Sequence, residues 1–196
     1  MSIPILQQLL FELGGVLPVD TQPLFDMTRN IELPANEAYI QEGDTGKKLA
    51  FIERGIMRAY ATKDNGDEAT LFLRWEGQFI ASHDTIIHLR PARFTYRCLE
   101  DTILLEMDYD VLEKVLSEHR EYEPLRNFFL MKMLAESLEM NESFVMLSAE
   151  DRYLKLMHDK FDIVNRVPDK YIASMLGITP VSLSRIRKRL QKAGKP

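Results

Sequence analysis

The chain has 196 residues, of which 45% are apolar and 28% charged, with a net charge of −5 and a single cysteine, Cys98. This length fits one domain or two small ones. The composition is too apolar for a disordered protein, and one cysteine excludes a disulfide framework, a four-cysteine iron–sulfur cluster and a structural zinc finger. No apolar stretch approaches the roughly 18 residues of a bilayer span, and the N-terminus lacks the basic region of a secretion signal. We therefore expect a soluble cytoplasmic protein.

The charge is unevenly distributed along the chain. Residues 145–196 carry eleven Lys and Arg against five Asp and Glu, whereas residues 1–144 carry a net charge of −11. No acidic residue follows Asp169 in the sequence. This asymmetry predicts a basic module fused to an acidic body, although a solvated basic tail would give the same count.

The first 107 residues change from a helical to a strand-like pattern. Apolar residues at helical spacing predict a short helical segment within residues 3–28, stopped by Gly14-Gly15. From about residue 30 to 107, short β-branched or alternating runs are separated by turn signals, which predicts an antiparallel sandwich, roll or barrel. Asn65-Gly66 is the strongest of these signals, and we expect a two-residue type I′ hairpin there.

From Asp108 onward the apolar period is helical. Asp108 is placed to cap one helix, and Pro124 is placed to open a second and longer one. On the longer helix an apolar seam recurs at coiled-coil-like spacing and consists of Leu125, Phe128, Met131, Ala135 and Leu138. Because the neighbouring positions are also apolar, we predict that one face packs on its own domain and another on a second copy of the chain. Burial of both faces within one chain is the alternative.

Residues 169–188 match the helix-turn-helix pattern. The second helix crosses the first at a small residue, Ala173, and the turn has Gly177, which tolerates the left-handed conformation. All five core-facing positions are apolar, namely Ile172, Leu176, Ile178, Leu183 and Ile186. Thr179 is a good N-cap, and Pro180 suits the first helical position. An ordinary antiparallel helix pair also needs a small residue and a glycine, but it does not need positive charge on one side.

The second helix of this unit predicts a DNA-reading surface. In helix-turn-helix proteins the N-terminal part of this helix meets base edges, while cationic side chains contact phosphates. The predicted DNA-binding residues are Thr179, Pro180, Val181, Ser182, Ser184, Arg185, Lys188 and Arg189. Arg185 is the candidate for a bidentate guanine contact, because its planar fork satisfies both O6 and N7. Arg187 and Lys192 are assigned to the phosphates, together with Lys188 and Arg189.

The order of these parts resembles the Crp–Fnr family of bacterial transcription regulators. Similar segments are the strand pattern around Gly43-Asp44 and Gly55, WEGQFIAS at 75–82, SAEDRYLKLM at 148–157 and IASMLGITPVSLSRIRKRL at 172–190. The last of these looks closest to members from Bacteroidetes-type bacteria.

The resemblance implies an α+β fold with three parts. These are an N-terminal double-stranded β-helix (a cyclic-nucleotide-binding-like jelly roll), a long dimerisation helix and a C-terminal winged helix-turn-helix. We place the domain limits at 1–107, 108–147 and 148–196. The resemblance further implies a homodimer that binds near-palindromic double-stranded DNA, contacts RNA polymerase, responds to an unidentified small-molecule effector and has no enzymatic activity. Only four residues follow Lys192, which leaves little room for the final strand pair of the family's wing.

The predicted sensing site departs from the family pattern. Members that bind cyclic nucleotides use a Gly-Glu pair followed by Arg-Ser, and the arginine pairs with the cyclic phosphate. Ala81-Ser82 and Ala92-Arg93 occupy these positions here, so we expect no binding of cyclic AMP or GMP. The remaining candidate effector-pocket residues are Ser82, His83, Arg90, Arg93 and Arg97. Their three arginines could hold an anionic effector or could pair with Glu100 and Asp101.

We assign no cofactor and no metal site. His83, His88 and Cys98 are candidate axial ligands for haem, but a lone histidine is more often an ordinary packed or surface residue. The alternative function is a cupin-like small-molecule or metal-binding β-roll protein without a DNA-binding role. A cupin needs three converging ligands, and His83 and His88 fall on opposite faces if their segment is extended.

Overall fold

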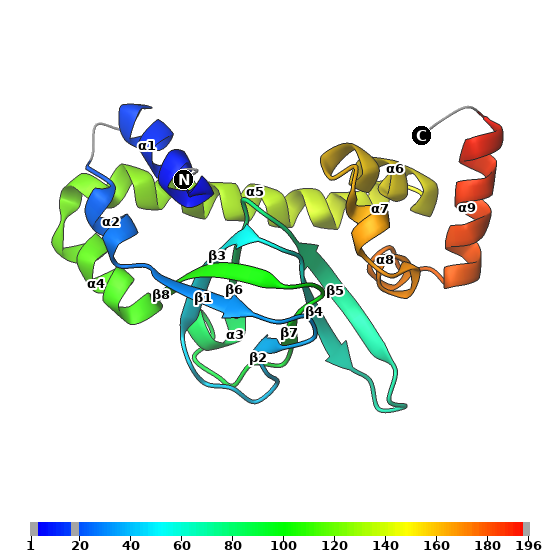
Figure 1. The fold of residues 1–196 in the computed structure, drawn as a ribbon, viewed down its shortest axis with the longest axis horizontal. Coiled ribbons are helices and arrows are strands. Elements are labelled where there is room, and N and C mark those ends of the chain that lie inside the picture. The colour runs from blue at the N-terminus through cyan, green and yellow to red at the C-terminus, as the bar shows by residue number, and fades with distance from the viewer. Residues whose placement is uncertain (1–3, 17–19, 194–196) are drawn as a thin grey trace.

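The computed structural model of the chain describes residues 4–16 and 20–193 (Figure 1). Its strands are β1 (Arg29–Leu33), β2 (Ala38–Ile40), β3 (Lys48–Arg54), β4 (Met57–Thr62), β5 (Glu68–Arg74), β6 (Phe79–Ala81), β7 (Thr95–Cys98) and β8 (Thr102–Asp108). Its helices are α1 (Ile5–Val16), α2 (Gln22–Asp26), α3 (His83–Ile86), α4 (Tyr109–Glu118), the 3₁₀ turn η1 (Arg120–Tyr122), α5 (Glu123–Met146), α6 (Ala149–Asp159), α7 (Ile163–Arg166), α8 (Asp169–Met175) and α9 (Pro180–Lys192).

The strands form two antiparallel sheets that pack face to face. One sheet has the strand order β1-β8-β3-β6 and the other β2-β7-β4-β5. Buried side chains from both sheets fill the space between them, including Ile52, Met57, Tyr96 and Leu104. This arrangement confirms the predicted β-roll of an α+β fold.

The central strands β3 and β8 are buried on both faces. Ile52 and Leu104 point into the roll, whereas Phe51 and Leu105 pack on the other side with residues of α1, α2, α4 and α5. A strand covered on both faces needs apolar residues at consecutive positions rather than in strict alternation. The N-terminal helices and the start of α5 therefore belong to the body of the roll.

The N-terminal helical segment differs from the prediction in its limits. Gly14 and Gly15 lie inside α1, which continues to Val16, and a separate short helix, α2, follows. Glycine destabilises a helix interior by only about 1 kcal/mol, which tertiary packing can outweigh. Residues 17–19, which fall within the predicted segment, lie outside the described residues.

The β4–β5 hairpin also differs from the prediction. The turn hydrogen bond runs from the Gly66 N–H to the Lys63 carbonyl at 2.8 Å, and Lys63 N–H donates to the Asp67 carbonyl at 2.8 Å. Gly66 has a φ of +85°, whereas Asn65 does not have a positive φ. The loop is thus a longer type I turn closed by a left-handed glycine, not a two-residue type I′ turn. The Asn65 side chain accepts from Asp67 N–H at 3.1 Å, which favours this conformation.

The predicted helix starts after the roll are confirmed. The Asp108 carboxylate accepts from Val111 N–H at 3.1 Å and caps α4, and Pro124 lies in the first turn of α5. Helix α5 runs from the roll to the C-terminal helices (Figure 1). Within the described residues, no helix combines the length and the apolar character needed to cross a membrane. No strand follows α9 up to residue 193, and residues 194–196, on which the wing prediction falls, lie outside the described part.

Candidate nucleic-acid interface

Helices α8 and α9 form the predicted helix-turn-helix. Ala173 is fully buried at the crossing point, and Gly177 takes a φ of +71° in the turn. The Ile178 N–H returns to the Ala173 carbonyl at 3.0 Å, which closes the turn. The core-facing residues Ile172, Leu176, Leu183, Ile186 and Leu190 lie in one cluster with residues of α6 and α7, and Ile178 packs at its edge.

The start of α9 is fixed by its own cap. The Thr179 side-chain oxygen accepts from the Ser182 N–H at 3.2 Å, and the two hydroxyl oxygens lie 3.1 Å apart. Pro180 occupies the first turn, where its missing N–H is not needed. Two of the predicted DNA-binding residues, Thr179 and Ser182, therefore define where the helix begins.

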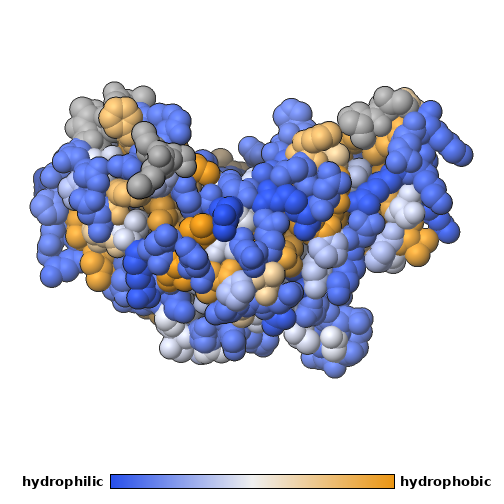
Figure 2. Space-filling model, in the orientation of Figure 1, coloured by the Kyte–Doolittle hydropathy of each residue, from blue (hydrophilic) through white to orange (hydrophobic). Residues whose placement is uncertain are grey.

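The other side of α9 faces outward. Val181 is 61% exposed, and Ser184, Arg185 and Lys188 are exposed as well. Helix α9 lies at the end of the molecule opposite α1 and runs across the direction of α5 (Figure 1). Hydrophilic residues cover most of its surface in this view, with hydrophobic residues at its N-terminal end (Figure 2).

Two cations of α9 have acidic partners within the chain. Arg187 donates two hydrogen bonds to Asp169, at 2.7 and 2.8 Å, and one to the Tyr153 hydroxyl at 3.1 Å. Arg189 donates to Glu150 at 2.6 and 3.1 Å. Sequence reasoning missed these acidic partners, because no local spacing relates α9 to the starts of α6 and α8. Arg187 thus binds other residues of the helix-turn-helix unit and does not lie on the exposed face, where we expected it to contact phosphates.

The seam predicted for dimerisation is exposed over most of its length. Leu125 is buried against the roll, while Phe128 is exposed at 40%, Met131 at 65% and Leu138 at 53%. Ala135 is exposed too. Further exposed apolar residues extend this surface along α5, namely Leu130, Met133, Leu134, Phe144, Val145 and Met146.

The candidate effector segment contains an internal anion. The Asp84 side chain is completely buried and accepts from Arg90 Nε at 2.8 Å and from Arg93 Nε at 3.0 Å. Burial alone would raise the pKa of Asp84, but these bonds and the Arg93 N–H outweigh it and hold the pKa at about 2. The two arginines therefore pair with Asp84 and not with the acidic residues that we expected, since Glu100 contacts Arg166 and Asp101 contacts the Ala35 N–H.

The other predicted effector residues do not converge on one hollow. Among the described residues, neither the buried Ser82 hydroxyl nor the buried Arg97 Nε has a hydrogen-bond partner. A hollow of about 340 Å³ is lined by Thr45, Lys47, Thr85, Leu89, Arg90 and Pro91, so only Arg90 of the predicted set borders it.

The two histidines of this segment lie on and beside a short helix. His83 begins α3, so the segment is not extended, and the rings of His83 and His88 lie 6.0 Å apart. Burial lowers the pKa of His83 below its ordinary value. Over the described residues, no group of three or more His, Cys, Asp or Glu side chains is arranged to hold a metal ion.

The chain is similar to one domain family and to individual regulatory proteins. Residues 30–119 match the family model of the cyclic nucleotide-binding domain. The chain is 20% identical over 176 residues to the regulatory protein HlyX of Actinobacillus pleuropneumoniae, covering 81% of this chain and 70% of that protein. It is 22% identical to the fumarate and nitrate reduction regulatory protein of Yersinia pestis, covering 84% and 70%.

Solved structures share the fold over most of the chain. The c-di-GMP responsive global regulator CLP of Xanthomonas campestris superposes with a TM-score of 0.65 at 19% identity, covering 88% of this chain and 91% of that one. FixK2 of Bradyrhizobium japonicum superposes with a TM-score of 0.67 at 15% identity, covering 85% and 86%. The match extends beyond the roll to the C-terminal helices, because such coverage exceeds residues 30–119.

Proposed function

We propose that this chain, which belongs to the Crp–Fnr family of bacterial transcription regulators, binds a near-palindromic DNA site as a homodimer through α9. One observation carries the proposal: α9 buries one stripe of side chains and exposes Arg185 and Lys188 on the other. A helix of this kind can enter the major groove without unfolding any part of the unit.

The exposed residues of α9 between Pro180 and Arg189 have side chains that suit particular DNA contacts. Val181, Arg185 and Lys188 follow one another at helical spacing and so share one side of the helix. We assign Arg185 to a guanine, and Val181, with Pro180 and Ser184 beside it, to base edges such as the thymine methyl. Lys188 is assigned to a phosphate. Arg189 reaches a phosphate only by exchanging Glu150 for it.

The dimer would form along α5. Its apolar residues are too exposed for a monomer, and Met131 and Leu138 lie at heptad spacing on the same side. A two-fold axis along this helix would present two copies of α9 to one face of the duplex, with half-sites about 34 Å apart. Leu125 belongs to the roll core rather than to this surface.

The effector site is proposed not to bind cyclic AMP or GMP. Arg90 and Arg93, the side chains suited to a phosphate, already pair with the buried Asp84. A cyclic phosphate would have to take these arginines from Asp84, and the buried carboxylate would then be left without a partner or solvent. We further propose that the protein acts in the cytoplasm beside RNA polymerase, where promoter DNA is found.

The experiment that tests the function is selection of random duplex DNA by the purified protein, followed by a salt titration on the enriched sequence. We expect a near-palindrome whose binding constant falls steeply with salt, because phosphate contacts release counterions. The double variant Arg185→Ala/Lys188→Ala should lose the enrichment. Lys114→Ala, on α4 and 72% exposed at its side chain, is the matched control and should keep it. Failure of the unmodified protein to enrich any sequence would overturn the proposal.

A further inference from the structure

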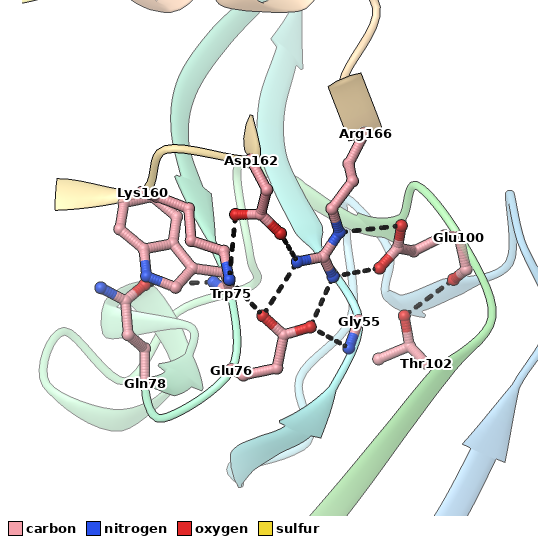
Figure 3. Close-up of polar contacts among 9 residues, drawn as sticks. All are labelled: Gly55, Trp75, Glu76, Gln78, Glu100, Thr102, Lys160, Asp162 and Arg166. Carbon is pink, nitrogen blue, oxygen red and sulfur yellow. Dashed lines mark hydrogen bonds and ion pairs between the residues drawn. The ribbon is translucent and has the colours of Figure 1, made fainter. Parts of the chain in front are cut away.

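An ion-pair network joins the helix-turn-helix unit to the β-roll. We propose that this network fixes the direction in which α9 points and thereby the half-site spacing that the dimer accepts, an inference that rests on the proposed DNA-binding function. We call it the Arg166 clamp. It consists of Arg166 at the end of α7, Lys160 and Asp162 in the α6–α7 connection, and Glu76 and Glu100 from the roll (Figure 3). Its residues are positioning residues, because none lies on the exposed side of α9.

All three nitrogen atoms of the Arg166 guanidinium donate hydrogen bonds in the clamp. Its Nη2 atom lies 2.5 Å from Glu76 Oε1 and its Nη1 atom 3.2 Å from Glu76 Oε2. It also contacts both oxygens of Glu100 and, through Nη1, Asp162 at 2.8 Å. Lys160 reaches Glu76 at 3.0 Å. The side chains of Arg166 and Glu76 are only 21% and 20% exposed, so salt screens this pair less than an open surface pair.

The roll itself also binds the Glu76 carboxylate. The Gly55 N–H donates to Glu76 Oε1 at 3.0 Å. Gly55 has a φ of +108°, and a Cβ atom there would lie 2.5 Å from Thr102 Oγ1, so this backbone position beside Thr102 requires glycine. The carboxylate is therefore oriented by the roll and presents a fixed receptor to the C-terminal helices.

A second contact holds α8 on the same side of the roll. The Thr70 N–H of β5 donates to the Ser174 hydroxyl at 2.9 Å. The guanidinium of Arg58, which is 2% exposed, stacks 3.8 Å above the ring of Tyr171. Roll residues Ile56 and Leu73 complete the apolar core of the helix-turn-helix unit. Since α8 lies between β5 and α9 (Figure 1), these contacts and the clamp restrict how the unit can turn.

The restriction matters because a dimer must place two copies of α9 at once. The connection from α5 to α6 is only residues 147–148, which limits distance but leaves rotation to the contacts on the roll. Two half-sites lie about one helical turn apart, and a change of one base pair moves a half-site by about 3.4 Å along the axis. A helix-turn-helix unit that is held in one direction fits one half-site spacing and loses little entropy on binding. A unit that can rotate fits several spacings, but it loses more entropy when it binds DNA.

The test compares spacing preference in Arg166→Met with that of the unmodified dimer. Arg166→Met keeps the unbranched start of the side chain and removes the guanidinium donors that bind Glu76, Glu100 and Asp162. Binding is measured on the selected site and on the same site with one base pair inserted or deleted between half-sites. We expect the variant to lose most of the spacing preference, to bind the selected site about tenfold more weakly, and to bind random DNA as before, because its phosphate contacts are unchanged.

Two further variants make the outcome decisive. Glu100→Gln removes a different member of the clamp and should act in the same direction if Arg166→Met does not fold. Arg126→Met is the control. It breaks the ion pair between Arg126 of α5 and Glu113 of α4, whose atoms Nη2 and Oε1 lie 2.5 Å apart, and it should leave the spacing preference intact. If the unmodified protein binds its site and both clamp variants keep its spacing preference, the clamp is overturned while the DNA-binding function stands. If the unmodified protein binds no DNA, the function itself fails.

Discussion

Arg187 and Asp169 link the two helices of the helix-turn-helix, with Arg187 Nη1 donating to both carboxylate oxygens at 2.7 and 2.8 Å. The arginine is largely covered, since its side chain is 26% exposed. It therefore stabilises the unit, although it belongs to a helix whose other cations face solvent. We expect Arg187→Met to lower the free energy of unfolding by about 1 kcal/mol, the value of a well-formed pair at the surface.

The same variant separates stability from DNA contact. Denaturant titration measures the first quantity, and the slope of DNA affinity against salt measures the second. We expect the slope to stay unchanged at a temperature where the variant is folded. A slope reduced by about one phosphate contact would place Arg187 on the DNA instead.

Glu150 pairs with Arg189, one of the residues that we propose to contact DNA. The pair is short, at 2.6 Å, yet the arginine side chain is 61% exposed, so a phosphate can compete for it. We expect Glu150→Gln to raise the affinity for random DNA and to steepen the salt dependence by about 0.9, the value of one added phosphate contact. Salt titrations on a random duplex measure both.

The control for Glu150 removes the same charge elsewhere. Glu139→Gln deletes a carboxylate that pairs with Lys155 of α6 at 3.4 Å, not with α9. It should change affinity slightly and leave the salt slope as it is. Equal slopes for the two variants would show that net charge, not release of Arg189, is responsible.

The buried Asp84 predicts that the free energy of unfolding of the roll depends on pH. Its pKa lies at about 2 because the bonds from Arg90 and Arg93 outweigh the effect of burial, whereas an unfolded aspartate titrates near 3.9. A depressed pKa stabilises the fold above pH 4, and this stabilisation is lost as the pH falls towards 2. We expect Asp84→Asn to cost about 2 kcal/mol at pH 7, measured by urea unfolding, and the difference from the unmodified protein to shrink below pH 4. A difference that stays constant between pH 7 and pH 3 would argue against the pairing.

The apolar surface of α5 predicts the oligomeric state. Leu138→Asp places a charge in the middle of the proposed dimer surface, at a residue 53% exposed in the single chain. We expect sedimentation to report a monomer and the folded chain to keep its stability within about 0.5 kcal/mol. Phe11→Asp, at an 80% exposed residue on α1, is the control and should remain dimeric. A dimeric Leu138→Asp protein would move the interface away from this part of α5.

Local chemistry made the helix ends and the helix-turn-helix predictable from sequence. Asp108 and Thr179 each accept a backbone N–H within three residues, and Gly177 supplies a conformation that other residues rarely adopt. These features depend on neighbours in the chain. The Asn65-Gly66 turn shows the limit, because the Asn65 side chain bonds to Asp67 and selects a different turn from the one that its sequence favours.

The pairings between distant parts of the chain could not be predicted. Arg166 and Glu76 are 90 positions apart in the sequence. Before the fold is known, many acidic residues of the chain are equally good partners for a given arginine. The wrong partners for Arg90 and Arg93 have a different cause, because Asp84, Glu100 and Asp101 lie at similar separations from them in sequence and the conformation of the segment decides which one they meet. The exposed seam on α5 could be predicted, whereas the burial of Leu125 depends on how the roll meets the helix.

The most direct test of the account is the base preference of Arg185→Ala, measured on every single-base variant of the selected site. We expect the variant to lose discrimination at one base pair in each half-site, by about 1–3 kcal/mol, and to keep it at the others. A uniform loss of affinity with every base preference intact would show that Arg185 does not read a base, and the assignment of α9 as the reading helix would be contradicted.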